Sequence, residues 1–208
     1  MKCRTLSTAA VLAITLLVSS PGPARAQQGD LAKQSNLFEV GLYLGALFPS
    51  SRHELYHQTA HQAFDKAVFD IGLRIAWLPI ASLGLELEGA LMPGKTRGDQ
   101  SALLWTVRGH VIAQLPLWKR WAPFIVVGGG TIGVKSKSDA VGTDNDGAFH
   151  YGAGLKYYPT DWMNVRLDFR HIVSARAFDQ DYANHFEALA GVGFVFGWEN
   201  PPPVKDRD

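Results

Sequence analysis

The chain has 208 residues, a formal charge of +1, 47% hydrophobic residues and a single cysteine. This length suits one domain with a short appendage, and one cysteine excludes a disulfide-stapled scaffold. The near-zero charge argues against a nucleic-acid-binding protein, because it provides no basic field to attract phosphate. Charged residues make up 19% of the chain, below the roughly 25% of typical soluble domains, and this deficit needs an explanation.

Residues 1–26 are predicted to be a secretory signal peptide. Lys2 and Arg4 form a positive start, an uncharged apolar stretch covers residues 6–19, and Ala-Arg-Ala at 24–26 has the small-x-small pattern of a cleavage site. The apolar stretch is shorter than the about 20 residues that span a bilayer comfortably. We therefore expect an exported protein rather than one held by a retained N-terminal anchor.

Removal of this segment changes the charge of the chain. Lys+Arg falls from 20 to 17 against 19 acids, so the mature protein would carry a charge of −2. Cys3 would also be removed. Because it lies before the apolar stretch and not directly after the cleavage site, a lipidated N-terminus is not expected.

The mature sequence alternates between two kinds of position, which is the signature of β-strands. Eight alternating runs are expected, at 38–48, 67–78, 82–92, 101–115, 122–135, 148–158, 162–173 and 185–197. One face of these runs contains a single histidine and no Asp, Glu, Lys or Arg. The fifth run is ambiguous, and we assign its cleaner alternation to the uncharged face: Phe124, Val126, Gly128, Gly130, Ile132 and Val134.

The opposite face of the runs carries charges of both signs. Its six acids and five bases are Glu39, Asp70, Arg74, Glu86, Glu88, Arg108, Lys156, Arg166, Asp168, Arg170 and Glu187. Glycines are interspersed among them. This composition suits a narrow lumen that is filled by ion pairs, whereas the exposed face of a soluble sheet would be richer in Lys and Glu. An ion-conducting path or gate is the other interpretation of the same cluster.

The lengths of the runs and of their connections favour a membrane barrel. The runs have about 11–15 residues, against about 5–6 for soluble strands and about 9–11 for tilted membrane strands. The connections alternate between long (49–66, 93–100, 136–147 and 174–184) and short (79–81, 116–121 and 159–161), as in outer-membrane barrels with short periplasmic turns. Closure would pair every backbone group in lipid.

Aromatic residues gather near the short turns and near the end of the last run. We expect Trp77, Trp118, Trp121, Tyr157, Trp162 and Trp198 to form a ring at the periplasmic membrane interface, where amphipathic rings are best solvated.

Residues 151–171, YGAGLKYYPTDWMNVRLDFRH, carry a G-x-G-x-x-Y strand, a short turn with an Asp, and an R-x-D-x-R strand. This segment resembles the sixth and seventh strands of OmpA-like eight-stranded outer-membrane barrels, and the resemblance extends over about residues 37–198. Pro201-Pro202-Pro203 is similar to the start of the hinge that leads to a peptidoglycan-binding domain in OmpA itself. No such domain is expected here, so tethering to the cell wall is not carried over.

We predict an all-β fold, an eight-stranded antiparallel up-and-down transmembrane β-barrel. The predicted organisation is a signal peptide at 1–26, an N-terminal periplasmic extension at 27–36, the outer-membrane barrel at 37–198 and a Pro-rich polar C-terminal tail at 199–208. Eight strands leave room only for side chains inside the barrel, which disfavours a wide porin.

Three short motifs lie in segments expected to be external loops. His53-Glu-Leu-Tyr-His57 matches the H-E-x-x-H zinc-protease pattern, but it falls in a loop and no strong third ligand follows, so His53, His57 and His61 are only weak metal candidates. Arg97-Gly98-Asp99 is an RGD tripeptide, which carries little information. Residues 144–147, DNDG, resemble half a calcium loop without its remaining acids, and are interpreted as a polar loop that ends at a glycine turn.

A membrane hydrolase would need a nucleophile beside a base. His171 and Ser174 are close in sequence, but their spacing places them on opposite faces of a strand. We therefore expect no enzyme and no cofactor. The expected function is a structural or surface-interaction role in the outer membrane of a diderm bacterium. The alternatives are a narrow ion channel, a soluble periplasmic lipocalin-like ligand-binding barrel, and a barrel-embedded hydrolase.

The expected partners follow from this placement. They are outer-membrane lipid and the barrel-assembly and chaperone machinery, with no nucleic acid, and the partner of the external loops is not specified by the sequence.

Overall fold

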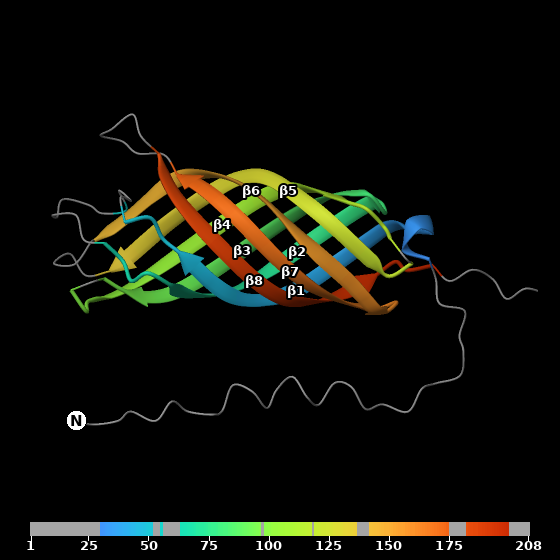
Figure 1. Ribbon diagram of the computed structural model, residues 1–208, viewed down its shortest axis with the longest axis horizontal. Helices are drawn as coiled ribbons and strands as arrows, with labels where there is room; N and C mark the ends of the chain where they lie inside the picture. Colours follow the sequence, from blue (N-terminus) through green and yellow to red (C-terminus); the bar gives the residue numbers. More distant parts are fainter. Residues whose placement is uncertain are drawn as a thin grey trace, which may run out of the picture.

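The computed structural model describes residues 30–51, 55, 63–96, 98–117, 119–136, 142–174 and 182–199. Within them, eight antiparallel strands form one closed barrel in which each strand pairs with its sequence neighbours and β8 pairs with β1 (Figure 1). The strands are β1 (Ser35–Phe48), β2 (Val68–Ile80), β3 (Leu83–Lys95), β4 (Ser101–Gln114), β5 (Trp121–Ser136), β6 (Thr143–Thr160), β7 (Met163–Ser174) and β8 (Ala183–Phe196). The predicted eight-stranded up-and-down barrel is confirmed.

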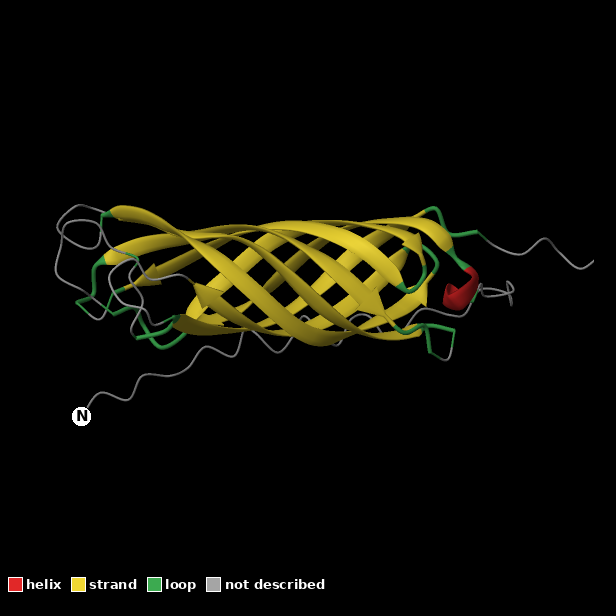
Figure 2. Ribbon diagram, turned by 90° about the horizontal axis from the view of Figure 1, so that it is seen from above, coloured by secondary structure: helices red, strands yellow, loops and turns green. Residues whose placement is uncertain are grey.

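The two ends of the barrel differ. Short connections at 81–82, 115–120 and 161–162 lie at one end, where the 3-10 turn η3 (Leu31–Lys33) also lies (Figure 2). The strand ends Phe48 and Val68, Lys95 and Ser101, Ser136 and Thr143, and Ser174 and Ala183 lie at the other. Because short turns of outer-membrane barrels face the periplasm, we call the first end periplasmic and the second extracellular. None of the helical turns in the described ranges is long and apolar enough to cross a membrane.

Side chains alternate between the interior and the outer surface, as the two-residue period of a strand requires. In β2, Ile71, Leu73 and Ile75 are about half exposed, whereas Asp70 and Arg74 are buried. The same separation holds along the other strands. The uncharged face is therefore the outside of the barrel, and the orientation predicted from the sequence is correct for seven of the eight runs.

The assignment of faces in β5 is wrong. Phe124 and Val126 are buried inside the barrel, as are Ile132 and Val134, whereas Ile125 is 63% exposed. The reason is that Gly128 and Gly130 of β5 must face inward. A Cβ atom on Gly130 would lie 2.7 Å from the Cα of Arg108 on β4, so β5 yields interior space to the large side chains of its neighbour. The alternation of apolar residues alone does not show which face of β5 points into the barrel.

The beginning of β6 differs from the expected loop. Residues 144–147 lie inside β6, where Asp144 pairs with Val134 and Gly147 with Thr131 of β5. The backbone pairing of β5 and β6 continues through this polar segment to Lys135 and Thr143 at the extracellular end, so both strands are longer than expected. The interpretation of residues 144–147 as a loop is therefore wrong. Residues 1–29, the histidines of the H-E-x-x-H match, Arg97, Trp118 and residues 200–208 lie outside the described residues.

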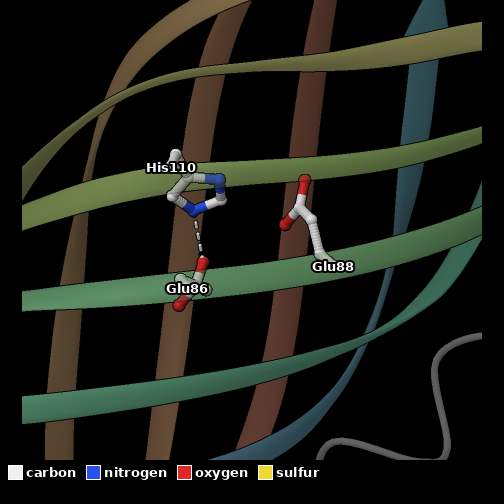
Figure 3. Close-up of side chains that lie close together, drawn as sticks. All are labelled: Glu86, Glu88 and His110. Carbon is white, nitrogen blue, oxygen red and sulfur yellow. Dashed lines mark hydrogen bonds and ion pairs between the residues drawn. The ribbon is translucent and has the colours of Figure 1, made fainter.

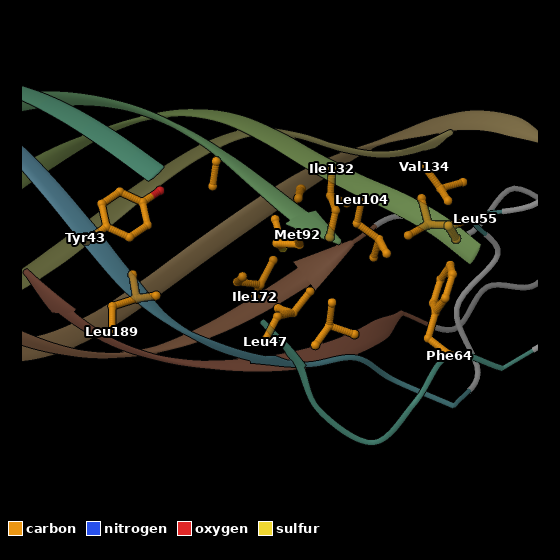
Figure 4. Packing of buried hydrophobic residues seen from close by; sticks show 14 residues of the cluster. Tyr43, Leu47, Leu55, Phe64, Met92, Leu104, Ile132, Val134, Ile172 and Leu189 are labelled. Carbon is orange, nitrogen blue, oxygen red and sulfur yellow. The ribbon is translucent and has the colours of Figure 1, made fainter. Parts of the chain in front are cut away.

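The interior has an ionic layer between two apolar layers. The extracellular apolar layer includes Leu47, Met92 and Leu104, and it also receives Leu55 and Phe64 from the connection between β1 and β2 (Figure 4). The periplasmic apolar layer contains Leu31, Leu37, Ala76, Leu78, Ala122, Tyr158 and Val195. Leu31 is fully buried, so η3 covers the periplasmic mouth of the barrel.

Candidate functional site

The eleven charged residues predicted for the lumen all lie in the interior of the barrel. Each of them is at most 7% exposed. They come from seven strands (all except β5), whose inward-facing positions lie at a similar height. Buried charges are costly unless they are paired and hydrogen-bonded, so the contacts among them decide what this layer can do.

Arg166 lies at the centre of the layer. Its Nη2 donates to Oδ1 of Asp168 at 2.7 Å, and its Nη1 donates to Oε2 of Glu86 at 2.5 Å. Arg74 donates to the other oxygen of Asp168 at 3.0 Å. The guanidinium of Arg166 also lies 4.2 Å from the ring centre of Phe124, a residue of the inward face of β5. The ring quadrupole attracts such a cation.

The extracellular side of the layer is held by two further arginines. Nη2 of Arg108 lies 2.7 Å from Oε1 of Glu88 and 2.9 Å from Oε2 of Glu187. Arg170 donates a short hydrogen bond to Glu88 and contacts Asp168 at 3.1 Å. Four strands are therefore linked through one group of arginines and carboxylates.

The periplasmic side of the layer is a smaller cluster around Glu39. Nζ of Lys156 donates to Oε2 of Glu39 at 2.7 Å, and the Tyr158 hydroxyl donates to Oε1 at 2.7 Å. Tyr158 was not among the predicted lumen residues. Its position two residues after Lys156 on an alternating strand is the sequence signal that identifies it.

Asp70 is the exception in the layer. It is fully buried, neither of its carboxylate oxygens accepts a hydrogen bond from a described basic side chain, and its carboxyl group interacts with that of Glu187. It adds the sixth acid to five bases, so the layer is not a set of one-to-one pairs.

Glu86, Glu88 and His110 are grouped as metal ligands would be. Their nearest ligand atoms lie within 4.8 Å of one another, and Nε2 of His110 lies 2.6 Å from Oε1 of Glu86 (Figure 3). Both carboxylates, however, already contact arginines. A divalent cation would have to displace these guanidinium groups, so the geometry favours ion pairing within the protein over metal binding.

His110 also contacts a second buried histidine. Its Nδ1 lies 3.2 Å from Nε2 of His150 on β6. Neither histidine was identified from the sequence. Both could have been, because each lies an even number of residues from a charged inward position on its own strand: His110 from Arg108 on β4, and His150 from Lys156 on β6.

Ser174 contacts a histidine, but not His171. His171 faces outward and contacts the Tyr151 hydroxyl at 2.8 Å, as the predicted opposite faces require. Ser174 faces inward, with its Oγ 3.1 Å from Nε2 of His185. The Nδ1 of His185 accepts a hydrogen bond from the backbone N–H of Ser50 at 3.1 Å. Nε2 then carries the proton in the neutral ring, so His185 donates to Ser174 and does not act as its base.

Four of the predicted interface aromatics lie on the outer surface near the periplasmic end. Trp77, Trp121, Tyr157 and Trp162 are between 37% and 55% exposed. Trp198 is different. Gly197 has a φ of 83° and turns the chain across the barrel mouth, so Trp198 packs against the periplasmic apolar layer. Its expected place on the membrane-facing ring is wrong.

Two of the three residues of the RGD tripeptide are described. Asp99 has a φ of 62°, and its carboxylate accepts a hydrogen bond from Nζ of Lys95 at 2.6 Å. This contact lowers the pKa of the Asp99 carboxyl below its ordinary value. The aspartate is therefore engaged within its own turn.

A closed barrel with an apolar outside and an ionic interior defines the class of outer-membrane β-barrel proteins. Residues 10–196 match the model of the outer membrane protein beta-barrel domain, and the chain belongs to this family. Members of the family lie in the bacterial outer membrane. Comparison with curated protein sequences gives no match.

Several solved structures share the fold. Neisserial surface protein A has a TM-score of 0.59 at 11% identity, covering 76% of this chain and 96% of that one. The N-terminal barrel domain of Pseudomonas aeruginosa OprF has a TM-score of 0.53 at 17% identity, covering 79% and 100%. Ail of Yersinia pestis has 0.52 at 12% identity, covering 78% and 99%. The resemblance to eight-stranded outer-membrane barrels is confirmed.

Proposed function

We propose that this protein is a non-enzymatic outer-membrane barrel with a sealed interior, and that it serves as a rigid support for its extracellular connections. The observation that carries the proposal is the order of layers inside the barrel. An ion that crossed would have to pass the extracellular apolar layer, the ion-pair layer and the periplasmic apolar layer in turn.

The apolar layers oppose conduction because most of their side chains are apolar and cannot replace the hydration shell of an ion. Leu55 and Phe64 close the extracellular side, and both are at most 3% exposed. Transfer of an unpaired charge into such surroundings is strongly unfavourable. The ion-pair layer adds little space, since a cavity beside Arg74 and Asn164 measures about 10 Å³, enough for about one water molecule.

The absence of a catalytic arrangement supports a non-enzymatic role. In the described interior, the Ser174–His185 pair has the wrong proton arrangement for nucleophile activation, and the carboxylates of Glu86 and Glu88 are occupied by arginines. A surface-interaction role is further supported by Ail, which is named an attachment invasion locus protein and shares the barrel fold at low identity.

The experiment is conductance across a planar lipid bilayer. Protein refolded to its heat-modifiable form should give no single-channel steps. The double change Leu55→Asp/Phe64→Asp should still give none, because the ion-pair layer and the periplasmic apolar layer remain. Steady current from the wild-type protein that is lost in Arg166→Met or Arg170→Met would overturn the sealed barrel and establish the narrow channel.

A further inference from the structure

The outer surface of the barrel contains a groove of about 660 Å³ that extends from β1 to β4. Gly89 of β3 forms its floor. In the strand register, Gly89 lies opposite Leu73 of β2 on one side and Val107 of β4 on the other. The remaining outward walls are apolar and include Leu42, Ile71, Leu91 and Trp105.

The packing of the barrel does not require a glycine at position 89. A Cβ atom there would meet nothing nearer than the carbonyl oxygen of Thr106, at 3.7 Å. By contrast, a Cβ on Gly84 of the same strand would lie 2.8 Å from Leu78. The glycine at 89 therefore leaves open space on the lipid-facing side and serves no close contact inside the barrel.

Two lysines lie on the same outward face at the extracellular rim. Lys95 ends β3 and Lys135 lies near the end of β5, opposite Leu103 of β4. Both are exposed. Lys95 contacts Asp99 at 2.6 Å, but such an exposed pair contributes little and can exchange for another anion.

The distance between the groove and the rim matches one lipid leaflet. Gly89 is at the middle of β3, and the six residues from Gly89 to Lys95 span about 20 Å along an antiparallel strand. A strand tilted by about 35–45° converts this to about 15 Å along the membrane normal, which is half of the about 30 Å hydrocarbon core. The groove then begins near the bilayer centre, and the lysines lie at headgroup depth.

We propose that this groove binds one acyl chain of an anionic lipid of the outer leaflet, whose phosphate contacts Lys135 and Lys95. The groove gives shape complementarity, and the lysines select for negative charge, by about fivefold for each lysine near the surface. The proposal rests on the placement of the barrel in the outer membrane. It is independent of the sealed interior, so either can fail without the other.

The test is native mass spectrometry of the refolded protein with an equal mixture of phosphatidylglycerol and phosphatidylcholine. The wild-type monomer should retain one phosphatidylglycerol. Gly89→Leu should fill the groove and reduce this retention about tenfold. Gly109→Leu is the matched control, because Gly109 also faces outward with open space around its Cβ position but lies outside the groove. Val107→Phe should also reduce the retention of phosphatidylglycerol, because it narrows the groove without replacing a glycine.

The lysines are tested separately. Lys135→Gln should lower the preference for phosphatidylglycerol over phosphatidylcholine about fivefold, and the double change with Lys95→Gln should lower it further. Lys33→Gln, at the periplasmic end, should leave it unchanged. Equal lipid retention by Gly89→Leu, Val107→Phe and Gly109→Leu would overturn the proposal. So would a dimer that is lost in Gly89→Leu, because a second copy would then occupy the groove.

Discussion

Replacement of Arg170 by methionine removes one cation from the most connected part of the interior. Arg170 contacts carboxylates on β3, β7 and β8, including Asp168 at 3.1 Å and Glu187 at 3.9 Å. Its side chain is fully buried. Methionine keeps much of the volume and removes the charge, so the change isolates the electrostatic contribution.

The expected loss of unfolding free energy depends on which arginine partners the carboxylates retain. Loss of one partner of a buried ion pair costs about 3–5 kcal/mol, because an uncompensated charge remains in a low dielectric. Here Glu88 and Glu187 both retain Arg108, at 2.7 and 2.9 Å, and Asp168 retains Arg166. We therefore expect the lower end, about 3 kcal/mol of unfolding free energy, or roughly a hundredfold in the unfolding equilibrium.

The assay is equilibrium unfolding in urea of the barrel in lipid vesicles, followed by tryptophan fluorescence. Leu167→Met on the outward face of β7 is the control and should cost under about 1 kcal/mol, because volume-conserving apolar changes are tolerated. The double variant Arg170→Met/Glu88→Gln should lose less than the sum of its single changes, since contacting groups are coupled. An Arg170→Met protein as stable as Leu167→Met would refute the reasoning.

Three further changes test the interior. Gly130→Val should prevent folding, because its Cβ would overlap the β4 backbone at Arg108, whereas Gly109→Val should fold and show normal heat-modifiable gel mobility. Tyr158→Phe should lower the unfolding free energy by about 1–3 kcal/mol in the urea assay, because it removes a hydrogen bond from a buried carboxylate. Leu55→Asp should destabilise the barrel and increase proteolysis at the extracellular end, since it places a charge in an apolar layer.

The fold could be predicted because membrane strands must separate apolar from charged positions. In β2 and β7 the charged positions specify which face is inside, and their alternation continues for the full strand. The strand ends were less predictable. β6 extends to Thr143 through polar residues, because backbone pairing with β5 and not hydrophobicity decides where a ladder stops.

The members of the ionic layer were identifiable from parity, but their contacts were not. Alternation states that Glu39 and Lys156 both face inward. It does not state that they meet, because they are 117 residues apart and lie across the barrel. The position of Trp198 was missed for a related reason, since the turn at Gly197 reverses the face that simple alternation assigns.

The ionic layer is better explained by register than by stability alone. Well-packed apolar residues are often as stabilising as a buried ion pair, so stability does not require the charges. A slip of one residue in strand pairing, however, would move every inward side chain to the lipid face, where a charge near the membrane centre costs about 2–4 kcal/mol. The charges therefore penalise incorrect registers.

β5 has no inward-facing charges that could penalise an incorrect register. Its only charged residue is Lys135, near the extracellular end, so either face could meet lipid at little cost. The inward glycines replace the charges, because a shifted β5 would direct Ile125 or Val127 at the backbone of β4 where Gly128 and Gly130 allow close approach. The correct register of β5 thus depends on steric exclusion, and Gly130→Val should disturb it more than the loss of any single ion pair disturbs the charged strands.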